Sequence, residues 1–135
     1  FLNDYLPPRT PIKVAKIQSG LSISKSTTVI DFKEDYSLTG EGRIEIKLKL
    51  SDSDMENVEK ECLKQEYKKL TIENLIDDGF LDSDSQFGFN MPNTDLRSIS
   101  NGLYKLKTTE LENMDFTMIV LDINNKELSI WTLIP

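Results

Sequence analysis

The residues best suited to chemistry lie in a polar stretch after residue 80. Asp82, Asp84 and Gln86 occupy alternate positions, the spacing at which a calcium-binding loop presents its first oxygen ligands. Phe87 stands where such a loop needs glycine for its sharp turn, and Asn93 stands where a glutamate would complete the shell. The sequence therefore indicates at most a weak cation loop at Asp82 and Asp84. No dedicated metal site and no cofactor are predicted.

Paired carboxylates offer a second chemistry, because two of them can hydrolyse a glycosidic bond without histidine. The sequence does not fix how far apart such groups lie, and a small domain of short strands leaves little room for a deep cleft. A carboxylate-based glycan hydrolase is therefore kept as an alternative. Its candidate residues are Asp77, Asp78, Asp82, Asp84 and Asp95.

The remaining enzyme templates lack their residues. The chain has no histidine and only one cysteine, Cys62, which excludes Ser-His-Asp and Cys-His systems and metal centres built on imidazole or clustered thiolates. No glycine-rich phosphate-binding motif occurs between a strand and a helix. We predict a protein that is not an enzyme.

Four large apolar residues interrupt the polar stretch, namely Phe80, Phe87, Phe89 and Met91. Protein interfaces favour aromatic residues and methionine ringed by polar groups, so these residues are candidates for a protein-interaction surface. The other explanation is that they pin a long loop onto the core. Both alternatives stay open from the sequence.

The charge of the chain constrains its partners. The net charge is −7 and no basic run exceeds Lys68-Lys69, so a phosphate backbone would be repelled and no nucleic acid partner is expected. Between residues 51 and 102, twelve acidic residues outnumber five basic ones. A solvated helix face explains this excess, but it would also attract a basic protein partner. An immunity-type inhibitor that covers a basic toxin is therefore a second alternative.

Alternating patterns predict strands in the first half of the chain. Residues Ile12 to Ile17 and Thr28 to Phe32 are expected to form two strands, and Arg43 to Leu50 a third with one buried face. Gly40-Glu41-Gly42 is expected to form the turn before the third strand.

The period then changes to that of a helix. Apolar residues from Met55 to Leu70 fall on one helical stripe, and Ser53 with Glu56 matches a capping box at its start. Thr71 is expected to cap a short second helix that ends at Gly79. A long loop from residue 80 to residue 101 follows.

Three more strands are predicted in the last third, at Leu103 to Thr109, Phe116 to Ile123 and Glu127 to Ile134. Residues Phe116 to Leu121 are apolar on both faces, which predicts a central strand. The expected fold is α+β: an antiparallel sheet of about six strands with one main helix and a short second helix packed on one face. The expected order is β-β-β-α-(α)-β-β-β.

Residues 12–135 are expected to form a single domain, preceded by a proline-rich lead-in or linker over residues 1–11. The chain starts at Phe1 rather than at methionine, so we expect that an upstream signal or anchor was removed. No apolar run approaches the length of a membrane span. We expect a monomer outside the cytoplasm, held at a membrane by an upstream anchor or secreted; a cytoplasmic location is the alternative.

The chain resembles small uncharacterised exported or membrane-anchored proteins of Gram-positive bacteria. The segments that carry this resemblance are Asp31-Phe32-Lys33, Gly40-Glu41-Gly42, Ile44 to Asp52, Asn101-Gly102-Leu103-Tyr104 and Ile119-Val120-Leu121-Asp122. The resemblance implies an anchored extracytoplasmic location and assigns no functional residue. The main functional prediction is a non-catalytic binding or interaction module.

Overall fold

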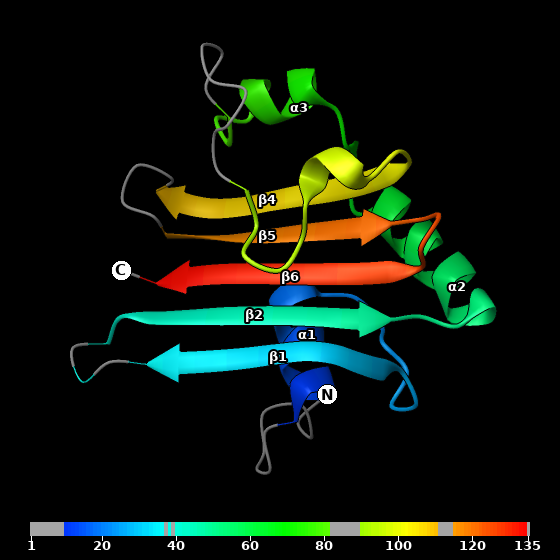
Figure 1. Cartoon of the computed structure of the whole chain (residues 1–135), viewed down its shortest axis with the longest axis horizontal. Helices are drawn as coiled ribbons and strands as arrows, with labels where there is room; N and C mark the ends of the chain where they lie inside the picture. The colour runs from blue at the N-terminus through cyan, green and yellow to red at the C-terminus, as the bar shows by residue number, and fades with distance from the viewer. Residues whose placement is uncertain (1–9, 37, 39, 82–89, 111–114, 135) are drawn as a thin grey trace.

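The computed structural model describes residues 10–36, 38, 40–81, 90–110 and 115–134, and Figure 1 shows their arrangement. In chain order the elements are α1 (Pro11–Ser19), β1 (Thr28–Tyr36), β2 (Gly42–Lys49), α2 (Asp52–Lys64), β3 (Lys68–Lys69), α3 (Ile72–Asp77), a 3-10 helix (Leu96–Ser98), β4 (Gly102–Glu110), β5 (Asp115–Asp122) and β6 (Glu127–Ile134).

The strands form one six-stranded antiparallel sheet in the order β1-β2-β6-β5-β4-β3. The last strand, β6, lies between β2 and β5 and so joins the two halves of the chain. The predicted α+β class and the sheet of about six strands are confirmed. The predicted central strand is also confirmed, because β5 lies inside the sheet with side chains buried on both of its faces.

Two apolar cores cover the two faces of this sheet. On one face α1 and α2 pack over β2, β6 and β5, where residues such as Val14, Val58 and Ile130 are fully enclosed. On the other face, α3 and the segment before β4 pack over β4, β5 and β6, with Phe80 and Trp131 among the buried residues. In Figure 1, α1 lies behind the sheet while the segment carrying the 3-10 helix crosses in front of β4 and β5.

The strand predicted from Ile12 to Ile17 is wrong, because this segment belongs to α1. The Thr10 side chain accepts a hydrogen bond from the backbone N–H of Lys13 at 3.2 Å, and proline occupies the first helical turn, where its missing N–H costs nothing. At the other end Gly20 adopts a left-handed φ of 69°, and its N–H donates to the Lys16 carbonyl. These two end signals override a short, interrupted alternation of apolar residues.

The prediction that both later helices share one face is also wrong. Leu75 of α3 packs with Tyr104 in one core, whereas Met55 and Val58 of α2 belong to the other. Between the two helices the chain pairs briefly with β4 as β3, at the edge of the sheet, and then continues on the opposite face. Ser51, rather than Ser53, caps α2 by accepting a hydrogen bond from the Asp54 N–H.

Candidate functional site

Phe80 and Met91, the two described members of the predicted protein-interaction surface, belong to the hydrophobic core. Phe80 is 1% exposed and Met91 is 4% exposed, so neither side chain can contact a partner while the domain is folded. For these two residues the core-anchoring alternative holds. Phe87, Phe89, Asp82 and Asp84 lie outside the described residues.

Phe80 forms one corner of a triangle of aromatic rings with Phe116 and Trp131. The ring centroids lie 6.3 Å from Phe80 to Phe116, 6.5 Å from Phe80 to Trp131 and 5.0 Å from Phe116 to Trp131. All three pairs meet edge to face, the geometry that aligns positive ring edges with negative ring faces. The triangle explains why the chain after α3 is held against the sheet.

Two of the carboxylates considered for hydrolysis, Asp78 and Asp95, make structural contacts. Asp78 accepts a hydrogen bond from the Lys68 ammonium at 2.6 Å and another from the Tyr104 hydroxyl at 2.5 Å. Partial burial opposes ionisation of Asp78, but these hydrogen bonds and the Lys68 charge together hold its pKa below the usual range. Burial, together with the hydrogen bond to Asp78, raises the pKa of Tyr104. Asp95 caps the 3-10 helix by accepting the Arg97 N–H.

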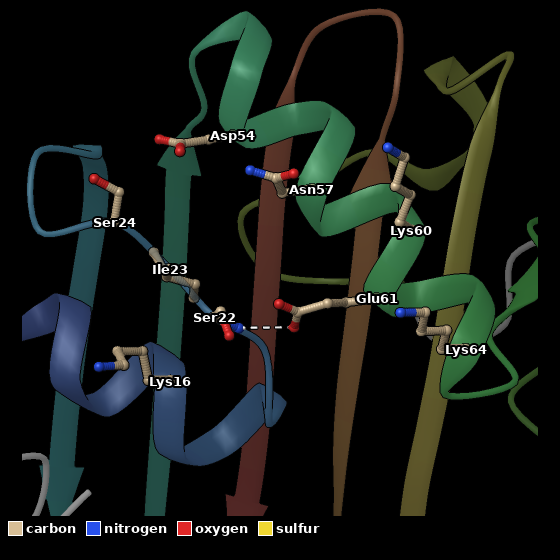
Figure 2. A pocket seen from close by; sticks show the side chains of 9 residues that line it. All are labelled: Lys16, Ser22, Ile23, Ser24, Asp54, Asn57, Lys60, Glu61 and Lys64. Carbon is tan, nitrogen blue, oxygen red and sulfur yellow. Dashed lines mark hydrogen bonds between the residues drawn. The ribbon is translucent and has the colours of Figure 1, made fainter.

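A pocket of about 530 Å³ lies elsewhere, between α1, α2 and the linker that joins α1 to β1 (Figure 2). We call it the α1–α2 cleft. Its size falls within the range usual for ligand sites. Eight of its nine lining residues are polar or charged. The lining residues are Lys16 from α1, Ser22, Ile23 and Ser24 from the linker, and Asp54, Asn57, Lys60, Glu61 and Lys64 from α2.

Two hydrogen bonds between the linker backbone and side chains at α2 hold the linker beside the α1–α2 cleft. Gly20 turns the chain at the end of α1, and its carbonyl accepts a hydrogen bond from the Gln65 amide at 3.1 Å. Two residues later the Ser22 N–H donates to Glu61 Oε2 at 2.9 Å. The linker is thereby tied to α2 at two points, so the two helices hold a defined separation across the pocket.

The α1–α2 cleft is basic relative to the rest of the chain. Three lysines and two carboxylates line it, whereas the whole chain carries a net charge of −7. Lys60 and Lys64 are one helical turn apart on α2, and Lys16 lies on the other side of the linker. Figure 2 shows the Glu61 side chain reaching from α2 to Ser22 of the linker, with Lys64 beside it and Lys60 extending away from the linker. The cations are thus spread along the pocket.

Behind the α1–α2 cleft, Cys62 faces the core. The side chain is fully buried, and burial, reinforced by the charges of Glu61 and Glu59, raises the pKa of its thiol to about 12. The thiol is therefore protonated at neutral pH and is a poor nucleophile or metal ligand. Among the residues that the structure describes, no group of three or more His, Cys, Asp or Glu side chains is arranged to hold a metal ion.

None of the nine lining residues was predicted as a site residue. In the sequence, Lys64 is explained as a favourable positive charge at a helix C-terminus. The spacing of the other lining residues does not distinguish them from ordinary polar surface residues. The cleft also depends on α1, which the sequence predicted as a strand. The signal that could have found it was the Thr10-Pro11 start and Gly20 end of that helix.

Comparison with protein-family models, with curated proteins and with solved structures gives no match for this chain. Its function must therefore be argued from the chemistry of its own residues. The resemblance to exported Gram-positive proteins stays a prediction. In the described part of the chain, no helix combines the length and the apolar character needed to cross a membrane.

Proposed function

We propose that this protein is a non-catalytic binding domain whose α1–α2 cleft holds an extended acidic segment of a partner protein. The observation that carries the proposal is the placement of three lysines along one pocket of a chain that is otherwise strongly acidic. Local positive charge in an acidic protein steers an anionic segment to this place in preference to the rest of the surface.

The spread of the cations favours an extended ligand. A single phosphate needs donors that converge on one point, whereas Lys16 lies across the linker from Lys60 and Lys64. Ser22, Ser24 and Asn57 add hydroxyl and amide groups between the charges, and these can pair with the alternating donors and acceptors of a peptide backbone. A peptide with several acidic side chains can pair its carboxylates with the lysines and its backbone with the hydroxyl and amide groups.

The hydrogen bonding of Glu61 favours binding over glycan hydrolysis. Glu61 accepts the Ser22 N–H, which engages one of its oxygens in holding the linker.

Fluorescence anisotropy with a labelled hexaglutamate peptide tests this proposal. We expect wild-type protein to bind the peptide and the double variant Lys60→Ala/Lys64→Ala to bind it about 2- to 30-fold more weakly, because two exposed ion pairs are lost. The matched control Lys25→Ala/Lys69→Ala removes two exposed lysines outside the pocket and should change the affinity little.

Salt and peptide charge sharpen the same experiment. Higher salt should weaken binding, because the contacts are between partly exposed charges. Equal binding of hexalysine, no binding of hexaglutamate, or equal losses in the two double variants would each contradict the proposal.

The extracytoplasmic, anchored location belongs with this proposal but rests on the sequence alone. Fractionation of cells that carry the whole gene, with an antibody to this domain, would test it. Recovery of the domain in the cytoplasmic fraction would contradict it.

A further inference from the structure

The first edge of the sheet is a long strand with an open side. β1 spans nine residues and pairs with β2 on one side, and no described element pairs with its other side. The opposite edge is the two-residue strand β3. Long edge strands present unpaired backbone N–H and C=O groups that can accept another strand. Val29 and Ile30, which are 38% and 49% exposed, add apolar surface at the start of this edge.

Charged residues form an ordered pattern on one face of β1 and β2. Lys33 lies opposite Glu45, and Asp31 lies opposite Lys47, so each cross-strand pair combines opposite charges. Asp35 continues the pattern with an ion pair of 3.4 Å to the Arg43 guanidinium. Charges therefore alternate in sign both along β1 and across to β2.

We infer that β1 pairs antiparallel with β1 of a second copy of this chain, about a twofold axis at Phe32. In this register Asp31 of each copy lies opposite Lys33 of the other. A row of four side chains then crosses the paired sheets. It consists of Lys47 and Asp31 from one copy, followed by Lys33 and Glu45 from the other, and the sign of the charge alternates along the row. On the other face the two Phe32 side chains, which border the core under α1, meet at the axis.

The neighbouring registers are unfavourable. An axis at Asp31, at Lys33, at Glu34 or at Asp35 places that residue opposite its own copy, so like charges face each other directly. An axis at Lys33 also sets Asp31 against Asp35. Among these five positions, only the axis at Phe32 brings opposite charges together without a like-charge pair. The charge pattern thus favours a second copy of this chain as the partner strand, and it favours the register centred on Phe32.

The dimer should be weak and reversible. A β-bulge between Val29 and Asp31 interrupts the regular pairing of β1, so regular contact between the copies is short. Bulges and charges are also the devices with which proteins protect an open edge. If the protein stays monomeric at every concentration, the bulge and the charges protect this edge against pairing, and the inference is overturned.

Sedimentation velocity over about 10 µM to 1 mM protein tests the inference with two single variants. We expect wild type to move toward the dimer mass as its concentration rises. Asp31→Lys sets lysines against each other and Lys33→Asp sets aspartates against each other, so each variant alone should stay monomeric. An equimolar mixture of the two should form dimers again, because both cross-copy pairs then join lysine to aspartate.

The mixture also discriminates the register. If the axis lay at Glu34, Lys33→Asp would set an aspartate against Asp35 of the other copy, and mixing would not restore the dimer. Single variants that dimerise like wild type, or a mixture that stays monomeric, would overturn the inference. Circular dichroism of each variant confirms that it is folded.

Disulfide trapping gives a second readout that needs no charge change. Phe32→Cys places a cysteine at the twofold axis, where directly opposed residues come close enough to be bridged under mild oxidation. Lys25→Cys, in the exposed loop before β1, is the control and should give little covalent dimer. The buried Cys62 does not interfere. Equal trapping at the two positions would contradict specific pairing at β1.

Discussion

Replacing Phe80 by alanine should destabilise the domain strongly. The side chain is 1% exposed and makes edge-to-face contacts with Phe116 and Trp131. Removing a buried phenylalanine ring costs about 3 to 5 kcal/mol in transfer and cavity terms, and the two aromatic contacts place this site near the middle of that range or above it. We therefore expect the free energy of unfolding to fall by about 4 kcal/mol.

Urea denaturation followed by tryptophan fluorescence measures this loss, since Trp131 is the only tryptophan and lies in the same cluster. With a denaturant slope of about 2 kcal/mol/M, the midpoint should move down by about 2 M. Phe80→Leu keeps most of the volume and loses the ring contacts, so it should cost about 1.5 kcal/mol. A loss below 1 kcal/mol for Phe80→Ala would refute the assignment of Phe80 to the core.

Three further outcomes follow from the described contacts. The pKa of Asp78 is lowered in the folded state, so its stabilising contribution is present above the unfolded value of about 4 and is lost as the pH falls through the folded pKa. Asp78→Asn, which weakens the contacts with Lys68 and Tyr104, should lower stability at pH 7 and flatten its decline toward pH 2 in pH-dependent urea titrations. In the folded protein Cys62 should not react with a chromogenic thiol reagent at pH 8, and it should react once urea unfolds the chain. The absorbance of the released chromophore measures this reaction. Rapid reaction of the folded protein would contradict the burial of Cys62. Lys105 donates to the carbonyl that ends α2 at 3.0 Å, so Lys105→Met should reduce the thermal midpoint by an amount corresponding to about 1 kcal/mol, and an unchanged midpoint would contradict this contact.

The strands were predictable where one physical signal dominated. In β2, Ile44, Ile46 and Leu48 alternate with charged residues, and the structure buries the first set against the helices. In β5 the apolar residues occupy both faces, which only an interior strand with two covered faces satisfies. Local sequence was sufficient in these cases because the position of a residue in the strand sets the face of the sheet on which its side chain lies.

The helices were harder, because their ends and their faces are set by different interactions. The pattern over Ile12 to Ile17 fits a short strand, and only the capping residues at Thr10 and Gly20 identify a helix. The face on which α3 packs depends on the two-residue pairing of β3 with β4, a long-range contact that no local pattern encodes.

The candidate site was hidden for the same reason. Lys16, Ser22 and Lys60 come from three separate elements, and each has the ordinary composition of a polar surface. Their proximity arises because α1 and α2 pack on the same face of the sheet and because two hydrogen bonds tie the linker to α2, from Ser22 to Glu61 and from Gln65 to Gly20. Sequence spacing carries no record of such contacts.

A titration of isotopically labelled protein with hexaglutamate, followed by amide chemical shifts in NMR spectra, tests the central claim most directly. We expect the largest shifts at Ser22, Asn57, Lys60 and Lys64, with little change at α3, which packs on the other face of the sheet. Shifts concentrated away from the α1–α2 cleft, or no shifts at saturating peptide, would contradict the proposal that this cleft is the binding site.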